Sequence, residues 1–259
     1  MNPILRTAPA WFESWFDTPE YHRLYAAHDD REAAAFVDRL VNWLAPPPGA
    51  RMLDLGCGAG RHAHALAAHG FDVIGLDLAP ETIRRAQRHE TSRLHFVHQD
   101  MREPFGHEKF DHVFSFFTSF GYFADAAEHD RVIDNVADAL RDAGTLVLDY
   151  LNVGWSERRL VASEQRNLDG RRYDISRWSD GTHFYKRIEA EANSGGDRVV
   201  HEERVAKFRL PDFERMLRRR GLAIEAVFGD YELRPFDAET SPRLIVVARK
   251  RAAAQQQAA

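Results

Sequence analysis

Short apolar runs alternate with segments of helical composition over most of the first 150 residues. Runs of strand length, bounded by glycine or polar residues, lie at 52–55, 71–77, 94–101, 110–117 and 145–152. Between or before these runs, segments 33–44, 62–69, 79–89 and 125–140 have the composition or the apolar spacing of helices. This alternation of strand and helix predicts an α/β fold built on a parallel sheet.

The pattern changes after residue 152. Segments 171–178, 182–190 and 198–208 alternate polar with apolar residues, and turn-forming clusters at 179–181 and 193–197 separate them. They predict an antiparallel β insertion, in which one face of the sheet can cover a site while the other meets water. A last helix at 211–220 and strands at 222–228 and 242–249 are then expected to complete the core.

Composition narrows the class of protein. The 259 residues carry a net charge of −5, which suits one α/β core with an insertion and argues against a dedicated nucleic-acid binder. Cys57 is the single cysteine, so no intramolecular disulfide can form, and the thirteen histidines show no metal-ligand spacing. We expect no metal. Residues 1–9 lack the apolar core of a signal peptide, and no run has the length of a membrane span, so we expect a cytoplasmic protein.

The candidate chemistry centres on the glycines at 56, 58 and 60, which stand between the first strand and the following helix. Glycine allows a tight turn and a close approach of backbone to ligand, and the next helix offers unpaired N–H groups. A dinucleotide fingerprint would need glycine or alanine three positions after Gly58, where Arg61 stands. Asp77, 19 positions after Gly58, ends the second strand and suits ribose hydroxyls, and Asp100 ends the third.

The segment from Asp54 to Gly60, D-x-G-x-G-x-G, resembles motif I of the class I S-adenosylmethionine (SAM)-dependent methyltransferases. The resemblance covers residues 33–150 by motif and 208–249 by order of elements. Segments 15–25 and 117–123 are similar to a bacterial group of uncharacterised methyltransferases. The resemblance implies a Rossmann-like seven-stranded sheet whose last two strands pair antiparallel, with SAM as cofactor.

The resemblance also implies roles for individual residues. Gly56, Gly58 and Gly60 would pass under the methionyl part of SAM, and Asp54 would fix the turn or meet the amino group through water. Asp77 would hold the ribose, Asp100 and Met101 the adenine, and Arg61 the methionine carboxylate. The remaining expected cofactor neighbours are Cys57, Leu78 and Phe117.

On the acceptor side, Tyr21, Tyr25 and Tyr122 are the candidate catalytic residues. Residues 10–28 are rich in aromatic side chains near helical spacing, which predicts either a helix packed on the core or a lid over the site. The aromatic turn at 118–123 should border the methyl group, because ligands bind beyond the carboxyl ends of parallel strands. Core packing is the alternative for Phe120, Tyr122 and Phe123.

These expectations divide the chain into an N-terminal helical lid (1–45), a SAM-binding core (46–152), a β insertion that roofs the acceptor (153–208), the end of the core sheet (209–250) and a disordered tail (251–259). The expected partner is a small-molecule acceptor that is methylated on N or O. Residues 117–120 are Phe-Thr-Ser-Phe, where amide and base-amine methyltransferases usually carry [Asp/Asn]-Pro-Pro-[Tyr/Phe]. This difference argues against methylation of an amide or of an exocyclic base amine. Asp149 remains either a general base or a structural carboxylate.

Two other functions remain open. An RNA or protein methyltransferase would need a basic strip near the strand ends, for which the candidates are Arg158, Arg159, Arg166, Arg171 and Arg172. A non-catalytic SAM-binding protein would bind the cofactor without turnover. The sequence gives no indication of the oligomeric state.

Overall fold

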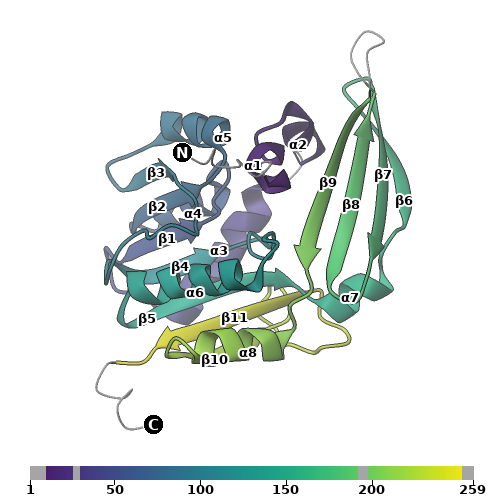
Figure 1. Ribbon diagram of the computed structural model, residues 1–259. Helices are drawn as coiled ribbons and strands as arrows, with labels where there is room; N and C mark the ends of the chain where they lie inside the picture. The colour runs from purple at the N-terminus through teal and green to yellow at the C-terminus, as the bar shows by residue number, and fades with distance from the viewer. Residues whose placement is uncertain (1–9, 26–29, 192–197, 253–259) are drawn as a thin grey trace, which may run out of the picture.

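The computed structural model describes residues 10–25, 30–191 and 198–252. A seven-stranded sheet forms the core, in the order β10-β11-β5-β4-β1-β2-β3 (Figure 1). Its strands are β1 (Arg51–Leu55), β2 (Asp72–Asp77), β3 (Leu94–His98), β4 (Phe110–Ser115), β5 (Leu140–Leu151), β10 (Leu222–Phe228) and β11 (Arg243–Lys250). The first five are parallel, and β11 runs antiparallel to both β5 and β10. This confirms the predicted Rossmann-like seven-stranded sheet.

Helices cover both faces of the core sheet. On one face lie α3 (Asp30–Leu44), α4 (Arg61–Ala68) and α5 (Pro80–Ala86), which is followed by a 3₁₀ turn at Gln87–His89. On the other lie α6 (Ala126–Ala139) and α8 (Leu210–Arg218). Asp125 caps α6 together with Glu128, which is why this helix begins where the sequence pattern places it.

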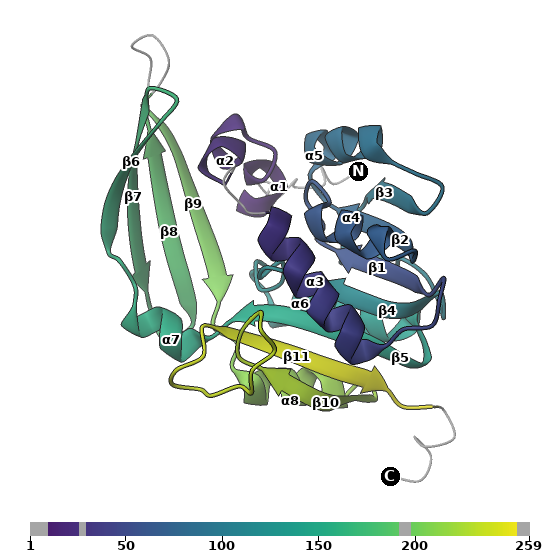
Figure 2. The same ribbon diagram turned by 180° about the vertical axis from the view of Figure 1, so that it is seen from behind.

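The insertion after β5 is a separate antiparallel sheet in the order β6-β7-β8-β9, which stands beside the core in Figures 1 and 2. Its strands are β6 (Ser163–Leu168), β7 (Arg171–Ser179), β8 (His183–Ala190) and β9 (Val199–Ala206), and α7 (Val153–Arg158) leads into it. The predicted β insertion is thus confirmed, but β6 and α7 were not anticipated. β6 is a largely exposed edge strand without apolar alternation, and α7 has only six residues.

The N-terminal segment forms two short helices, α1 (Trp11–Trp15) and α2 (Pro19–Leu24), where one helix was expected. Thr18 caps α2 and Pro19 starts it, so the chain turns between the two. Figures 1 and 2 both place this pair between the core and the insertion sheet. The Asp17 carboxylate accepts bonds from the backbone N–H groups of Glu81 and Thr82 at the start of α5, which ties the segment to the core.

Two of the differences from the predicted strand bounds need a physical explanation. Residues 141–144, Arg-Asp-Ala-Gly, have the composition of a turn and were expected to precede the strand. They form an irregularity within it instead, with Ala143 at φ 61°, so β5 begins at Leu140 rather than at 145. β3 ends at His98, so Asp100 lies in the turn that follows. The turn cluster 193–197 and residues 253–259 of the predicted tail lie outside the described residues. None of the described helices has the length and hydropathy needed to span a membrane.

Candidate functional site

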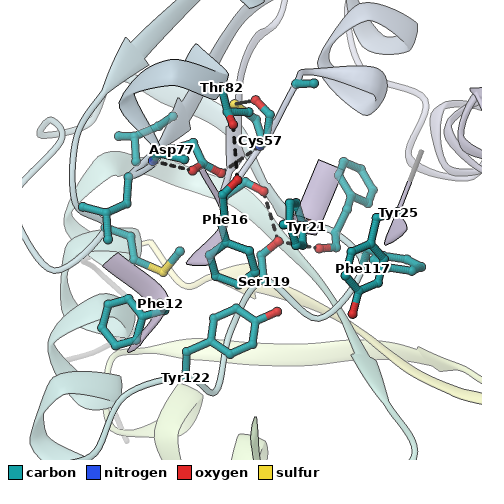
Figure 3. Close-up of a pocket in the computed structure, with 18 of the residues that line it drawn as sticks. Phe12, Phe16, Tyr21, Tyr25, Cys57, Asp77, Thr82, Phe117, Ser119 and Tyr122 are labelled. Atoms are coloured by element: carbon teal, nitrogen blue, oxygen red, sulfur yellow. Dashed lines mark hydrogen bonds between the residues drawn. The ribbon is translucent and has the colours of Figure 1, made fainter. Parts of the chain in front are cut away.

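A cavity of about 410 Å³ opens at the carboxyl ends of β1, β2, β3 and β4. The loops that follow these strands and the first residues of α3, α4 and α5 form one side of it. The helices α1 and α2 and strand β9 of the insertion form the other. Figure 3 shows part of the lining. Most of the expected cofactor and acceptor residues line it: Tyr21, Tyr25, Gly56, Cys57, Gly58, Arg61, Asp77, Leu78, Asp100, Met101, Phe117 and Tyr122.

The glycine turn has the conformation that its composition requires. Gly56, Gly58 and Gly60 all have positive φ, between 55° and 88°. A Cβ at Gly56 would lie 2.6 Å from Cβ of Ser119, so a side chain there would displace the neighbouring loop. At Gly58 a Cβ would point into open space, with no atom within 4 Å. The backbone at Gly58 is therefore exposed to a ligand in the cavity.

Asp77 is joined to this turn. One oxygen of its carboxylate accepts a bond from Gly58 N at 2.8 Å, and the other accepts one from Ala79 N at 2.9 Å. Burial raises the pKa of Asp77, while these two backbone donors oppose the increase. Each carboxylate oxygen has a second lone pair, so Asp77 can still accept bonds from two adjacent hydroxyl groups of a ligand.

Asp100 lines the cavity from the turn after β3. Its carboxylate is held in two-point contact by Arg102, from Nε at 2.9 Å and Nη2 at 2.6 Å to Oδ2, with Nε also 3.1 Å from Oδ1. Arg102 in turn contacts Glu128 of α6. Met101 beside it is fixed through its carbonyl oxygen, which accepts a bond from Asn135 at 3.1 Å. The turn at 100–102 is thereby tied to α6.

The loop after β4 contains two adjacent non-glycine residues with positive φ, Phe117 at 53° and Thr118 at 63°. Such a pair is strained and needs outside support. Asp149, which is 1% exposed, accepts bonds from Phe117 N at 2.8 Å and Arg243 Nε at 2.7 Å. Tyr231 donates a third bond to the same carboxylate. Asp149 does not line the cavity, so its position fits the structural alternative rather than the general base.

Aromatic side chains form the opposite wall of the cavity. The ring of Tyr122 lies 5.3 Å from those of both Trp11 and Phe16, and Tyr21 and Tyr25 lie 4.7 Å apart. Figure 3 shows Tyr122 and Phe12 across the cavity from Asp77. Burial, followed by the charge of Asp77, raises the pKa of Tyr21, so its hydroxyl group stays protonated.

Three expected positions do not line the cavity. Phe120 packs instead into the core near Phe208, Phe213 and His129, which is the packing alternative for that residue. Gly60 lies behind the turn, where a Cβ would clash with the ring of Phe96. Asp54 is 1% exposed and both of its carboxylate oxygens lack a hydrogen-bond partner among the described residues.

The environment of Asp54 perturbs its titration strongly. Burial, with a smaller contribution from the charge of Asp77, raises the pKa of Asp54 to about 7. Cys57 is also buried, and burial raises the pKa of its thiol well above the usual value, so it is not an activated nucleophile. Among the described residues, no group of histidine, cysteine and acidic side chains could hold a metal ion.

Glu203 is one of the lining residues that sequence reasoning missed. It projects from β9, and its Oε1 accepts bonds from Trp15 Nε1 at 2.8 Å and the Tyr25 hydroxyl group at 3.0 Å. The alternation at 198–208 predicts the strand, but nothing in that pattern indicates which neighbours a side chain would meet. Trp11, Phe12 and Phe16 also line the cavity, and their clustering in sequence was the only available signal.

The comparisons with known proteins point to methyltransferases. Residues 52–144 match the family model described as "Methyltransferase domain". A candidate methyltransferase of Bacillus subtilis (strain 168) is 31% identical over 134 residues, which cover 50% of this chain and 54% of that protein. A ubiquinone biosynthesis O-methyltransferase of Xanthomonas campestris pv. campestris (strain B100) is 34% identical over 54% of this chain and 56% of its own. The chain thus spans about half the length of these curated relatives.

Solved structures share the fold over most of the chain. An S-adenosylmethionine-dependent methyltransferase from Clostridium acetobutylicum ATCC 824 superposes with a TM-score of 0.75 at 17% identity, covering 89% of this chain and 96% of that one. The sugar N-methyltransferase KedS8 from Streptoalloteichus sp ATCC 53650 gives 0.71 at 22% identity, covering 97% and 98%. At these identities the likeness establishes the fold, including the insertion, and leaves the acceptor open.

Proposed function

The chain carries a class I SAM-dependent methyltransferase domain, and from this premise we propose that it transfers a methyl group from SAM to a nitrogen or oxygen atom of a small molecule. One observation carries the proposal. A single cavity has the glycine turn and Asp77 on one wall and a tyrosine-rich wall from α1, α2 and the insertion on the other. The two halves of a transfer reaction can therefore meet in one enclosed space.

The cavity residues fit the parts of the cofactor that this family uses. The open space over Gly58 suits close passage of the methionyl part, and Asp77 retains lone pairs for the ribose hydroxyl groups. Asp100 and Met101 would border the adenine, and Leu78 and Cys57 complete the apolar lining. Arg61 lines the cavity 4.8 Å from the centre of the Phe117 ring and would bind the methionine carboxylate. Asp54 and Gly60 would support the turn from behind.

Bound SAM supplies a methyl group on a sulfonium centre that is already a good leaving group. The protein then has to position the acceptor, exclude water and hold any proton that leaves. We assign the acceptor side to Tyr21, Tyr25 and Tyr122, whose hydroxyl groups can bind the acceptor, and whose rings can lie against the cationic sulfonium. Helices α1 and α2 would act as the lid.

The arrangement of arginines favours a small acceptor over RNA or protein. Of the five arginines in the expected basic strip, four face acidic partners: Arg158 pairs with Glu239, Arg166 with Glu164, Arg171 with Glu20, and Arg172 with Asp174. The fifth, Arg159, lies over the ring of Trp155. Their charge is thus largely balanced within the protein, which weakens attraction for a polyanion.

Titration calorimetry with SAM and with S-adenosylhomocysteine (SAH) tests the cofactor assignment. We expect micromolar binding to the wild type and at least tenfold weaker binding to Asp77→Ala, since the lost hydrogen bonds cost about 1.5–3 kcal/mol. The matched control is Asp72→Ala, at the opposite end of β2, where the carboxylate pairs with exposed Arg93. No binding of either ligand to folded wild type would overturn the proposal. Binding without turnover on any small-molecule pool would favour a non-catalytic protein.

A further inference from the structure

Glu203 lies where the cavity of about 410 Å³ described above, here called the cofactor cavity, meets a second cavity. Both cavities are lined by Glu203 and Val205, and the second one measures about 390 Å³. Strand register explains the continuity. Glu203 pairs with Lys186 and Val205 with Phe184, so these four side chains share one face of the insertion sheet. A molecule bound beside Glu203 therefore has room to extend away from the glycine turn.

The two oxygens of Glu203 are in different situations. Oε1 accepts bonds from Trp15 and Tyr25 and lies 3.4 Å from the ammonium group of Lys186, which also donates to the Tyr25 hydroxyl group. Oε2 lies 3.4 Å from the Tyr25 hydroxyl group, farther than Oε1 does. The Glu203 side chain is only 15% exposed. The carboxylate is thus fixed through Oε1, and Oε2 retains acceptor capacity for a ligand.

The surroundings of Glu203 favour a cationic ligand. Four acidic residues line the cofactor cavity, Asp30, Asp77, Asp100 and Glu203, against one lining arginine, Arg61. Arg102 balances the charge of Asp100, so three of the four acids face one cation in the lining. The wall next to Glu203 is aromatic, and the faces of such rings attract positive charge. This acidic charge affects the nearby tyrosines. Burial raises the pKa of Tyr21, Tyr25 and Tyr122, and the charge of Glu203 adds to the increase at each of them. Lys186 offsets part of this charge from the outer side.

We propose that Glu203 selects an amine as the methyl acceptor, by binding its ammonium form at Oε2 while the aromatic wall surrounds the rest of the molecule. This inference rests on the proposed function and narrows it from nitrogen or oxygen to basic nitrogen. In the reaction the ammonium group gives one proton to Glu203, and Glu203 then passes this proton to water. The freed electron pair of nitrogen forms the N–CH₃ bond while the S–CH₃ bond breaks, and that bond's electron pair stays on sulfur.

A purely structural role for Glu203 is the competing explanation. Its bonds to Trp15 and Tyr25 also hold α1 and α2 against the insertion sheet. Glu203→Gln separates the two roles. Glutamine keeps one oxygen that can accept bonds from Trp15 and Tyr25, but it loses the charge and replaces the second acceptor oxygen with an NH₂ donor. The matched control is Glu202→Gln, since Glu202 is exposed and points to the opposite face of the same strand.

The test uses three probes of similar size with the protein–SAH complex: benzylamine as a cation, benzyl alcohol as a neutral molecule and benzoate as an anion. Binding is measured by ligand-observed NMR titration. We expect wild type and Glu202→Gln to bind benzylamine at least tenfold more tightly than benzyl alcohol, with benzoate weakest. In Glu203→Gln the affinity for benzylamine should fall to within threefold of that for benzyl alcohol, with the affinities for SAM and SAH unchanged.

Three results would overturn the inference: no preference for benzylamine in the wild type, an unchanged preference in Glu203→Gln, or a parallel loss of SAH affinity in that variant. The last would place Glu203 in the cofactor site. If Glu203→Gln does not fold, two other measurements test the inference. The wild type should prefer benzylamine to benzyl alcohol, and this preference should increase in Lys186→Met; absence of either result would overturn the inference. Failure of the proposed function is recognised separately, because it would appear as absent SAM and SAH binding in the calorimetry.

Discussion

The core sheet and the insertion sheet contribute opposite walls of the same cavity, but they bury their side chains in different ways. In the core, β1, β4 and β5 are almost wholly buried between two layers of helices. In the described part of the insertion the buried hydrophobic cluster is small: Tyr173, Ile175, Ile188 and Ala190 pack against Trp15 and Leu24 of the N-terminal helices. The insertion sheet therefore depends on a partner segment more than 140 residues earlier in the chain for its hydrophobic face.

The origin of the functional groups differs in the same way. The cofactor wall uses backbone groups and short side chains at or just after the ends of strands, such as Gly58 and Asp77. The acceptor wall uses long side chains from α1, α2, β8 and β9 that meet only after the insertion has docked, as at Trp15, Tyr25 and Glu203. Mutations should therefore separate the two walls: changes in the glycine turn should affect the cofactor, and changes in the insertion should affect the acceptor.

Gly56→Ala should give the largest effect and should be confined to the cofactor wall. Its φ of 75° costs a side chain about 1–2 kcal/mol, and the contact at 2.6 Å with Cβ of Ser119 adds about 1–3 kcal/mol. We expect SAH binding in calorimetry to weaken at least thirtyfold. Gly70→Ala is the control: its φ is 87°, but no atom lies within 4 Å, so binding should stay within twofold. Equal losses in both variants would contradict the close-approach argument.

Ile188→Ala should affect the acceptor wall and largely spare the cofactor. Ile188 is 0% exposed in the cluster beneath Trp15, and its truncation should cost about 2–4 kcal/mol. We expect faster amide hydrogen exchange in β7, β8 and α2, while SAH affinity changes less than threefold. Val200→Ala, at a 46% exposed position of β9, should change neither quantity. Uniformly faster exchange across the core strands would show that the two sheets do not loosen separately.

The smallest expected effect is a pH dependence that belongs to the core alone. The pKa of Asp54 is about 7 in the fold, against about 4 in an unfolded chain, so the folded state holds a proton more tightly between these values. The free energy of unfolding should therefore fall as pH rises from 5 to 8, by on the order of 2 kcal/mol from this group. Urea denaturation of Asp54→Asn should lack this part of the fall. An identical pH profile in both proteins would contradict a raised pKa.

Much of the core was predictable because its signals are local. Periodicity located the five parallel strands. The glycines, Asp77 and Asp100 could be interpreted as a site because each lies at or shortly after the end of a strand. β10 was predicted with its observed bounds. The misses have physical reasons: β6 has no buried face to leave a pattern, and the turn expected at 141–144 was absorbed into β5 as an irregularity.

The sequence by itself determined the α/β core and the glycine turn, because strand–turn–helix order places those groups without any distant contact. The resemblance of residues 54–60 to motif I added the cofactor class. Only the tertiary structure decided the rest. In the folded protein Asp149 stabilises the strained Phe117–Thr118 loop by accepting a bond from Phe117 N. Tyr231 and Arg243 donate to the same carboxylate and fix its position. The tertiary structure also brought Glu203 to Tyr25, 178 positions away in the chain. Local pattern can show that a residue lies on a strand or helix, but the partner of a charged side chain depends on which surfaces dock.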